Sequence, residues 1–253
     1  MSESSQAKQI WHYDHAENLL SEAIRQVVSE HTCKLVVNGE DWISFICSPT
    51  DLEAMAIGFL WNEGVIGELS EIESLTLSED ASRLEVTINR GIAKPQSFHR
   101  TSTGIALDTP AELHQRLEEF NITAHQILEL YRQFNSLQKL HDEVGGFHSG
   151  GLSDSRKVQL VVEDLGRHNC VDKLAGLYLL SGKPYPASIL LLSGRISSEM
   201  VAKSNAMGVE MIISRTSPTT IAIELAEQVG ITLVGYLRGN KFEIYSHPWR
   251  IVT

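Results

Sequence analysis

The sequence predicts an α/β protein in two parts: a small N-terminal α+β domain, and a larger C-terminal domain whose mainly parallel sheet is flanked by helices. The 253 residues are enough for one large domain or two modest ones. From residue 157 onward, apolar runs of strand length alternate with helical segments, as in βαβ units. Glycine is concentrated in the same part, with 12 of its 18 copies from Gly145 onward, which indicates tight turns there.

The N-terminal part begins with a polar leader, residues 1–30, for which we predict no element. Residues 34–37 and 42–47 are short apolar runs joined by Asn38 and Gly39. These two residues suit the positive φ angles of a tight turn, so we predict a β-hairpin.

A helix is predicted next. Thr50 and Glu53 have the spacing of a capping box, and apolar residues then recur at helical intervals until Gly64. Residues 71–77 and 83–89 are predicted strands that complete the small domain.

Residues 91–110 form a loop rich in Ser, Thr, His and Gly. Its length favours either a functional loop or a domain linker. A helix is predicted at residues 123–140. The predicted divisions are a leader at 1–30, an α+β domain at 31–95, a linker at 96–122 and an α/β domain at 123–253.

The C-terminal domain contains four apolar runs that we predict as strands, at residues 158–162, 189–192, 211–213 and 231–237. The first three lead through polar turns into helical segments. Residues 242–245 follow a Gly-Asn pair and are predicted as a final antiparallel strand.

The polar turns are predicted to lie at one edge of this sheet. In an open parallel sheet, ligands bind at the carboxyl ends of the strands, where helix N-termini favour anions. Each turn contains one arginine, and Arg167, Arg195 and Arg215 have the donor geometry that phosphate requires. The turns therefore predict a phosphorylated ligand, although any one of them could be only a helix cap beside a solvated arginine.

A glycine-rich loop at residues 145–151 precedes the first of these strands, and its His148 could donate a hydrogen bond or move a proton near neutral pH. The loop matches neither GxxxxGK[ST] nor GxGxxG, so an NTPase or a Rossmann dehydrogenase is not supported. The pattern of the zinc deaminases is absent, and we expect no metal site.

Three cysteines, Cys33, Cys47 and Cys170, are spread along the chain without a CxxC motif. This argues against a disulfide framework, and the default interpretation is that they are buried.

The formal net charge is −11 and is unevenly distributed. Residues 1–150 carry 23 acidic and 10 basic side chains, whereas residues 151–253 carry 9 and 11. An acidic body repels a phosphate backbone, so no nucleic-acid partner is expected. No apolar stretch approaches membrane-spanning length, and the N-terminus is too polar for a signal peptide, so we expect a cytoplasmic protein without membrane association.

Several motifs over most of the chain resemble a known family. They are VNGED (37–41), AIGFLWNEGVI (56–66), GGFH (145–148), EDLGRHNCVDK (163–173), SGRISSEMVAK (193–203), SPTTIAIELAEQVGITLVGYLRG (217–239) and YSHPWRI (245–251). These segments are similar to the FdhD family, accessory proteins that act on the molybdenum cofactor of formate dehydrogenase.

The resemblance implies a cytidine-deaminase-like three-layer α/β/α fold for the C-terminal domain, without the zinc ligands. It also implies a homodimer that binds the molybdenum bis(guanylyl molybdopterin) cofactor, with GDP or a related guanine nucleotide as a mimic. The implied partners are a formate dehydrogenase apoprotein and a cysteine desulfurase. The candidate cofactor-binding residues are His148, Arg167, His168, Asn169, Ser193, Gly194, Arg195 and Arg215 from the turns, and Tyr236, Leu237, Arg238, Gly239, Asn240 and Lys241 from the segment that the resemblance implies.

The chain departs from the family in the CGxCG loop, whose thiolate accepts a persulfide and passes the sulfur on. The corresponding residues are 102–107, in which Thr103 and Ala106 replace the two cysteines. A threonine hydroxyl forms no persulfide, so Thr103 marks the family's catalytic position without its activity. The leading hypothesis is an accessory protein that binds the cofactor; the alternatives are a sulfurtransferase that uses another cysteine, such as Cys170, and an inert regulatory partner of a cysteine-bearing paralogue.

Overall fold

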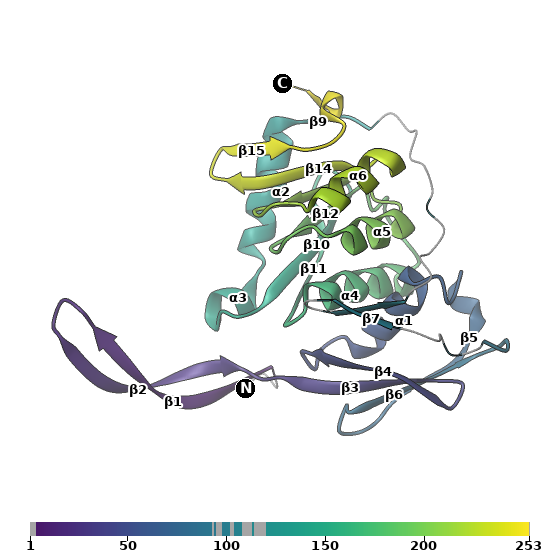
Figure 1. Cartoon of the computed structure of the whole chain (residues 1–253), viewed down its shortest axis with the longest axis horizontal. Coiled ribbons are helices and arrows are strands. Elements are labelled where there is room, and N and C mark those ends of the chain that lie inside the picture. Colours follow the sequence, from purple (N-terminus) through teal and green to yellow (C-terminus); the bar gives the residue numbers. More distant parts are fainter. Residues whose placement is uncertain are drawn as a thin grey trace.

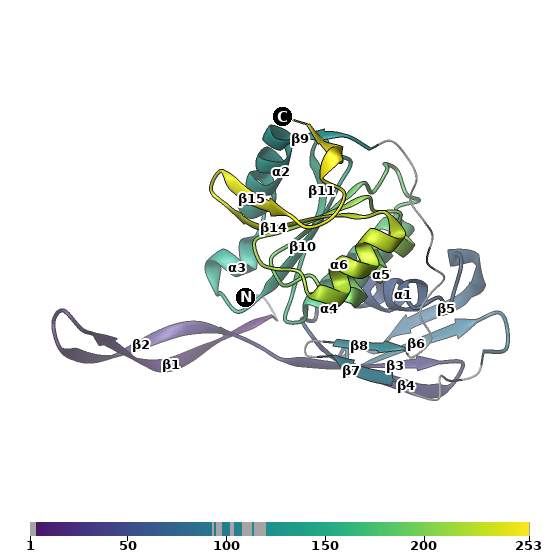
Figure 2. The same ribbon diagram turned by 45° about the horizontal axis from the view of Figure 1, so that its top comes forward.

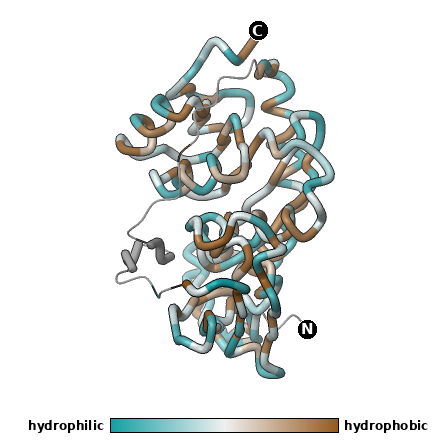
Figure 3. Tube along the Cα trace, turned by 90° about the vertical axis from the view of Figure 1, so that its right-hand side faces the viewer, coloured by the Kyte–Doolittle hydropathy of each residue, from teal (hydrophilic) through white to brown (hydrophobic). Residues whose placement is uncertain are grey.

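The computed structural model describes residues 4–92, 94, 98–101, 104–107, 113 and 120–252, with backbone alone for 98–101 and 104–107. Figure 1 shows a larger body built around one sheet, a smaller body below it and a hairpin that projects to one side. Figure 3 views the molecule from the side, with the C-terminus at the top of the larger body. No helix among the described residues is long and apolar enough to cross a membrane.

The smaller body is a four-stranded sheet of order β4-β3-β6-β5 that packs on helix α1. Its elements are β3 (His31–Val37), β4 (Glu40–Cys47), α1 (Leu52–Asn62), β5 (Ile72–Leu77) and β6 (Arg83–Ile88). The predicted hairpin is confirmed, since β3 and β4 are antiparallel and both turn residues have positive φ.

Helix α1 differs from the prediction at its start and in its burial. The predicted cap at Thr50 is wrong, because Asp51 is the N-cap residue, with a left-handed φ of 51° and no side-chain cap. The Thr50 hydroxyl instead accepts a hydrogen bond from Lys173 Nζ at 3.2 Å. The helix is also buried on two sides, by its own sheet and by α4 (Arg167–Leu180) of the larger body, so it has no wide solvent face.

The segment before β3 forms an antiparallel hairpin of β1 (Ser5–Asp14) and β2 (Leu19–Val28), each ten residues long. It extends away from both bodies in Figures 1 and 2. No element is predicted for this leader from the sequence, because neither face of the hairpin is buried and the residue pattern therefore gives no signal of a core face.

The larger body contains a six-stranded sheet of order β11-β10-β12-β13-β14-β15. The strands are β10 (His148–Ser153), β11 (Val158–Asp164), β12 (Ile189–Leu192), β13 (Met211–Ser214), β14 (Thr232–Arg238) and β15 (Lys241–Ile244). Strands β12, β13 and β14 are parallel, and β10 is antiparallel to both β11 and β12. Strands β11 to β14 therefore all end at the same edge, as predicted.

The first half of the glycine-rich segment turns before β10, and its second half belongs to the strand. Residues 145–151 are predicted as a loop, but β10 begins at His148, where it pairs with β11, and it pairs with β12 from Gly150 onward. Gly150 and Gly151 are residues of this strand, and a side chain at either position would be too close to a neighbour. A Cβ at Gly150 would lie 3.0 Å from Leu174, and a Cβ at Gly151 would lie 2.9 Å from Phe134. Both glycines thus permit close packing of helices on the sheet.

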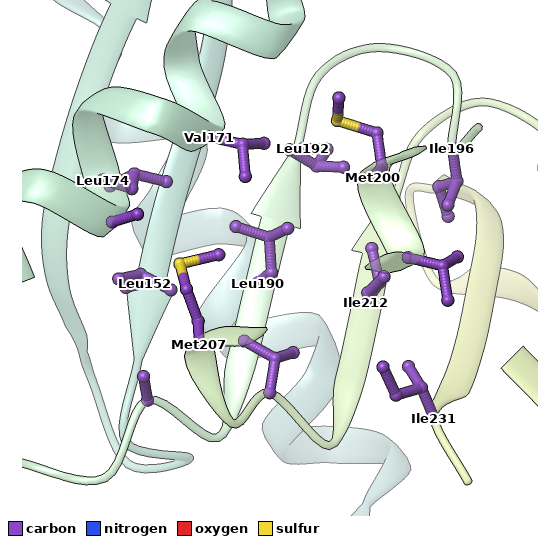
Figure 4. Packing of buried hydrophobic residues seen from close by; sticks show 14 of the residues in the cluster. Leu152, Val171, Leu174, Leu190, Leu192, Ile196, Met200, Met207, Ile212 and Ile231 are labelled. Atoms are coloured by element: carbon purple, nitrogen blue, oxygen red, sulfur yellow. The ribbon is translucent and has the colours of Figure 1, made fainter. Parts of the chain in front are cut away.

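Helices cover both faces of the sheet, which gives three layers (Figure 2). One face packs on α4, α5 (Ser198–Met207) and α6 (Thr220–Val229) through the cluster in Figure 4. The other face packs on α2 (Ala124–Ser136), followed by α3 (Lys139–Glu143). Along β12, Leu190 and Leu192 enter one core and Ile189 and Leu191 the other, as the period of a strand requires. The predicted α/β class is confirmed.

The remaining elements are short. They are β7 (Phe98–Thr101) paired with β8 (Gly104–Leu107), β9 (Ile122–Thr123) paired with β16 (Ile251–Val252), and two turns of 3₁₀ helix at Leu69–Glu71 and Pro248–Arg250.

Candidate functional site: the carboxyl edge of the six-stranded sheet

The centre of the edge is formed by the start of β10 and the end of β12. A Cβ built at Gly194 would lie 3.1 Å from His148 Nδ1 and 3.5 Å from Arg167 Cδ. The absence of a Cβ at Gly194 therefore makes room for the His148 ring, whereas the distance to Arg167 is that of an ordinary van der Waals contact. Burial, and secondly the charge of Arg167, hold the pKa of His148 below its usual value; the charge of Arg215 acts in the same direction. The imidazole is thus neutral at pH 7 and lies near arginines from two of the predicted turns.

A first pocket, which we call the α5–α6 pocket, has a volume of about 320 Å³ and lies at the N-termini of these two helices. It is lined by Arg167, Arg195, Ser197, Ser198, Glu199, Thr219, Thr220 and Ile221. The turns before α5 and α6 are bonded to each other, since Ile196 N donates to Ser217 O at 3.2 Å and Thr219 N donates to Ile196 O at 3.0 Å. All three predicted arginine-bearing turns therefore contribute to one pocket, although only two of their arginines, Arg167 and Arg195, line it.

The two arginines of this pocket differ in burial. Arg195 is exposed, whereas Arg167 at the start of α4 is only 8% exposed. Burial, followed by repulsion from Arg195, lowers the pKa of Arg167. The Glu199 carboxylate acts in the opposite direction on Arg167 and offsets part of this repulsion. A bound anion near both guanidinium groups would offset more of it, together with the cost of burial.

Glu199 is the acidic residue among the described side chains that line this pocket. His168 Nε2 donates to its Oε2 atom at 3.1 Å, and Ser197 Oγ donates to the same atom at 2.8 Å. These bonds, with that from His168 the larger cause, lower the pKa of Glu199 to about 2. The carboxylate is therefore ionised at neutral pH and held in one orientation.

Three of the predicted binding residues make hydrogen bonds inside the protein and do not line the α5–α6 pocket. His168 is 1% exposed and bonds to Glu199. Asn169 Nδ2 donates to Asp164 Oδ1 at 2.7 Å and to Ile46 O at 2.9 Å. Ser193 Oγ accepts a bond from the Ser149 amide at 2.9 Å. These three side chains therefore stabilise the carboxyl edge from inside the protein. Asn169 also connects this edge to β4 of the smaller body.

A second pocket, the α2–β14 pocket, has a volume of about 300 Å³ and lies on the opposite face of the sheet. It is lined by Leu128, Tyr131, Arg132, Asn135, Arg215, Leu237, Arg238, Gly239 and Asn240. Arg215 and four of the six residues that the resemblance implied are thus brought together. The predicted arginines do not converge on one pocket, because α2 and α5 cover different faces of the sheet.

Sequence reasoning missed Arg132 of α2, which lines this second pocket. Its guanidinium donates to Asn240 Oδ1 at 3.0 Å, which places a third arginine beside Arg215 and Arg238. The position of Arg132 on the polar side of α2 gave no signal, since the packing of that helix beside the β14–β15 turn is a tertiary feature.

The side chains of the candidate residues near the β14–β15 turn have different environments. Tyr236 is exposed and has a positive φ of 47°, beside the bulge between Gly235 and Arg238. The Arg238 guanidinium lies 5.7 Å from the centre of the Tyr236 ring. Lys241 is exposed, and Leu237 packs in the core.

The thiols of the chain are all buried and free. Burial is the main cause that raises the pKa of Cys33 to about 11 and that of Cys47 to about 12, and it also raises the pKa of Cys170 well above its usual value. Thr103 lies outside the described residues, and Ala106 is described only by its backbone in β8. Within the described residues, no group of three or more His, Cys, Asp or Glu side chains is arranged to hold a metal ion.

The fold and the edge define an α/β protein with two arginine-lined pockets at the carboxyl end of its central sheet. The family model for the FdhD/NarQ family matches residues 28–252. The chain therefore belongs to the FdhD/NarQ family, as the motifs predicted.

Similar proteins agree with this assignment. The sulfur carrier protein FdhD of Bacillus pumilus is 34% identical over 236 residues, which cover 89% of this chain and 90% of that protein. The protein of the same name from Staphylococcus aureus strain MRSA252 is 33% identical over 243 residues, which cover 90% of this chain and 89% of its own. A crystal structure described as a formate dehydrogenase accessory protein from Desulfotalea psychrophila is 27% identical, with a TM-score of 0.84 over 98% of this chain and 100% of that chain.

Proposed function

We propose that this chain is an accessory protein for formate dehydrogenase maturation that binds the molybdenum bis(guanylyl molybdopterin) cofactor, or a guanine nucleotide as its mimic, at the carboxyl edge of the six-stranded sheet. The description of the similar structure from Desulfotalea psychrophila supports the accessory role. The observation that carries the binding is the pair of Arg167 and Arg195 at the α5–α6 pocket, where one buried and one exposed guanidinium repel each other.

The residues of the edge fit a ligand with phosphate groups. Arginine forks and the hydroxyls of Ser198 and Thr220 are donors to phosphate oxygens, and α5 and α6 direct their N-termini at the same pocket. The α2–β14 pocket offers a second set of arginines, Arg132, Arg215 and Arg238. In this proposal the cofactor supplies the metal chemistry of the oxidoreductase, and this chain binds and orients its phosphates.

We further propose that the chain does not carry sulfur, so that a cysteine desulfurase is not a productive partner. Thr103 and Ala106 replace the cysteines of the family loop. Cys170 is a poor substitute, because its Sγ is buried and donates to His148 O at 3.4 Å, and its raised pKa disfavours the thiolate.

The test is calorimetric titration of GDP into the wild-type chain and into Arg195→Ala and Arg238→Ala, which report on the two pockets separately. A charge-assisted bond to phosphate contributes about 1.5–3 kcal/mol, so the loss of one that contacts phosphate should weaken binding by about tenfold or more. Arg25→Ala is the matched control, since Arg25 is exposed on β2 of the projecting hairpin. Unchanged affinity in both pocket variants would refute the assigned site.

A further inference from the structure

We propose that Glu199 makes the α5–α6 pocket select a phosphate that links two groups, with one negative charge, over a terminal phosphate, which carries nearly two. This inference rests on the proposed function and deepens it, because it names the kind of phosphate that the pocket takes. A terminal phosphate has a second pKa of about 6 and so gains its second charge near neutral pH, whereas a linking phosphate has only one charge to gain.

The side chains that line the α5–α6 pocket carry a small positive charge. Arg167 and Arg195 are its cations and Glu199 is its anion, and the other five described residues that line it are uncharged. His148 lies beside the same turn, and burial, followed by the charge of Arg167, lowers its pKa, so this imidazole adds no charge at pH 7. Two arginines therefore leave a formal charge of only +1 for a ligand.

The negative charge of Glu199 is fixed in place and stays ionised. His168 Nε2 and Ser197 Oγ both lie within hydrogen-bond distance of Oε2, at 3.1 and 2.8 Å, and His168 is itself buried. The bond with His168 is the largest cause of a Glu199 pKa of about 2. The carboxylate therefore neither gains a proton at neutral pH nor turns away from the pocket without losing both bonds.

Glu199 already provides a counter-charge for Arg167. Its carboxylate raises the pKa of this arginine, against the effects of burial and of Arg195. Part of the attraction of the buried guanidinium for an anion is therefore offset within the protein, and Arg195, which is exposed, is the cation that a ligand can pair with at less competition.

A pocket of this charge discriminates between the two kinds of phosphate. The single charge of a linking phosphate is matched by the formal charge of the pocket. The second charge of a terminal phosphate is repelled by the Glu199 carboxylate, and it also adds to the cost of removing the group from water. The diphosphate of a guanylyl pterin links two groups, so the ligand of the proposed function is of the favoured kind.

The α2–β14 pocket shows that a carboxylate is not a general feature of this edge. Three arginines line it, and its described lining residues include no Asp or Glu. Glu129 lies 3.3 Å from Arg132 in an exposed ion pair but does not line the pocket. The two pockets therefore differ in charge, and Glu199 is the acidic side chain that lowers the charge of the first.

The experiment compares GDP with its β-methyl ester by calorimetry at one ionic strength. The two ligands differ by one methyl group and nearly one negative charge. The wild-type chain should bind the ester more tightly than GDP. Glu199→Gln removes the charge and keeps an oxygen acceptor for His168 and Ser197. It should strengthen GDP about tenfold and the ester only about threefold, because the repulsion that is removed grows with the charge of the phosphate.

Glu22→Gln is the matched control, since it changes the net charge by the same amount on the exposed face of β2 in the projecting hairpin. It should leave both affinities unchanged. An equal gain for GDP in Glu22→Gln and Glu199→Gln would show that the net charge of the chain, and not the position of Glu199, sets the preference.

Arg195→Ala separates this inference from the proposed function, since it should weaken both ligands. If it does so but Glu199→Gln leaves the ratio of the two affinities unchanged, selection by Glu199 is wrong and the phosphate site stands. If the wild-type chain binds neither ligand, the proposed function itself is wrong. Should Glu199→Gln fail to fold, tighter binding of GDP than of its ester by the wild-type chain still overturns the inference.

Discussion

Gly58 of α1 and Gly176 of α4 let these two helices cross with their backbones in contact. A Cβ at Gly58 would lie 1.8 Å from the carbonyl oxygen of Asp172, and a Cβ at Gly176 would lie 1.8 Å from the carbonyl oxygen of Ala54. This crossing joins the smaller body to the helix that begins with Arg167. The position of the carboxyl edge of the six-stranded sheet relative to the smaller body therefore depends on the absence of a side chain at Gly58 and at Gly176.

Gly176→Ala should destabilise the chain by about 3 kcal/mol or more, because a methyl group that overlaps backbone atoms forces the helices apart. Chemical denaturation measures the free energy of unfolding. Gly91→Ala is the control, since a Cβ at Gly91 meets nothing within 4 Å. Equal stability of the two variants would show that the crossing does not depend on glycine.

Lys203→Met should cost about 3–5 kcal/mol of stability, because it leaves buried carboxylates without their cation. Lys203 Nζ lies 2.7 Å from Asp172 Oδ1 and 3.1 Å from Glu63 Oε1, and all three side chains are buried. The matched control is Lys34→Met, which removes the exposed ion pair with Asp41 and should cost far less. Similar losses in the two variants would contradict the role of the buried cluster.

The native chain should react with a thiol reagent at neutral pH far more slowly than the unfolded chain, in which all three cysteines are accessible. Burial hides each sulfur and raises the pKa of each thiol, so the reactive thiolate is scarce.

After incubation with a cysteine desulfurase and isotopically labelled cysteine, intact-mass spectrometry should show no added sulfur. A stable persulfide on Cys170 would contradict the account and support an active sulfurtransferase.

The stability of the chain should fall as the pH decreases from 7 through the pKa of an unfolded histidine, about 6.5. The folded-state pKa of His148 is lower than this value, so the unfolded chain gains a proton that folded His148 does not. His247 acts in the same direction, mainly through burial. His148→Gln should therefore show a shallower decrease that retains the His247 contribution. Denaturation series at several pH values measure it, and identical slopes for both proteins would exclude the proposed effect of His148.

Much of the larger body could be predicted because its strands are buried on both faces. Apolar runs such as residues 189–192 need no alternation to be recognised, and the polar turn after each one marks the edge. The insertion of β10 between β11 and β12 could not be predicted, since it depends on tertiary pairing. The hairpin of β1 and β2 was missed for the opposite reason, because neither of its faces is buried.

The candidate site was predictable only in part. Arg167 and Arg195 line one pocket because β11 and β12, which run in the same direction on either side of β10, end at the same edge of the sheet. Arg215 lines the α2–β14 pocket together with Arg132, which lies on helix α2 and is distant from Arg215 in the sequence. Asn169 has a residue type suited to a ligand, but the buried carboxylate of Asp164 holds it inside the protein. Residue type and turn position identify the edge, whereas the direction of each side chain depends on neighbours that only the fold supplies.

The central claim is that the carboxyl edge of the sheet binds the phosphates of a guanine nucleotide, and a crystal structure of the chain with GDP tests it most directly. The account predicts diphosphate oxygens within hydrogen-bond distance of the guanidinium groups of Arg167 and Arg195. GDP bound away from both arginine pockets, or absent from them at saturating concentration, would contradict the account.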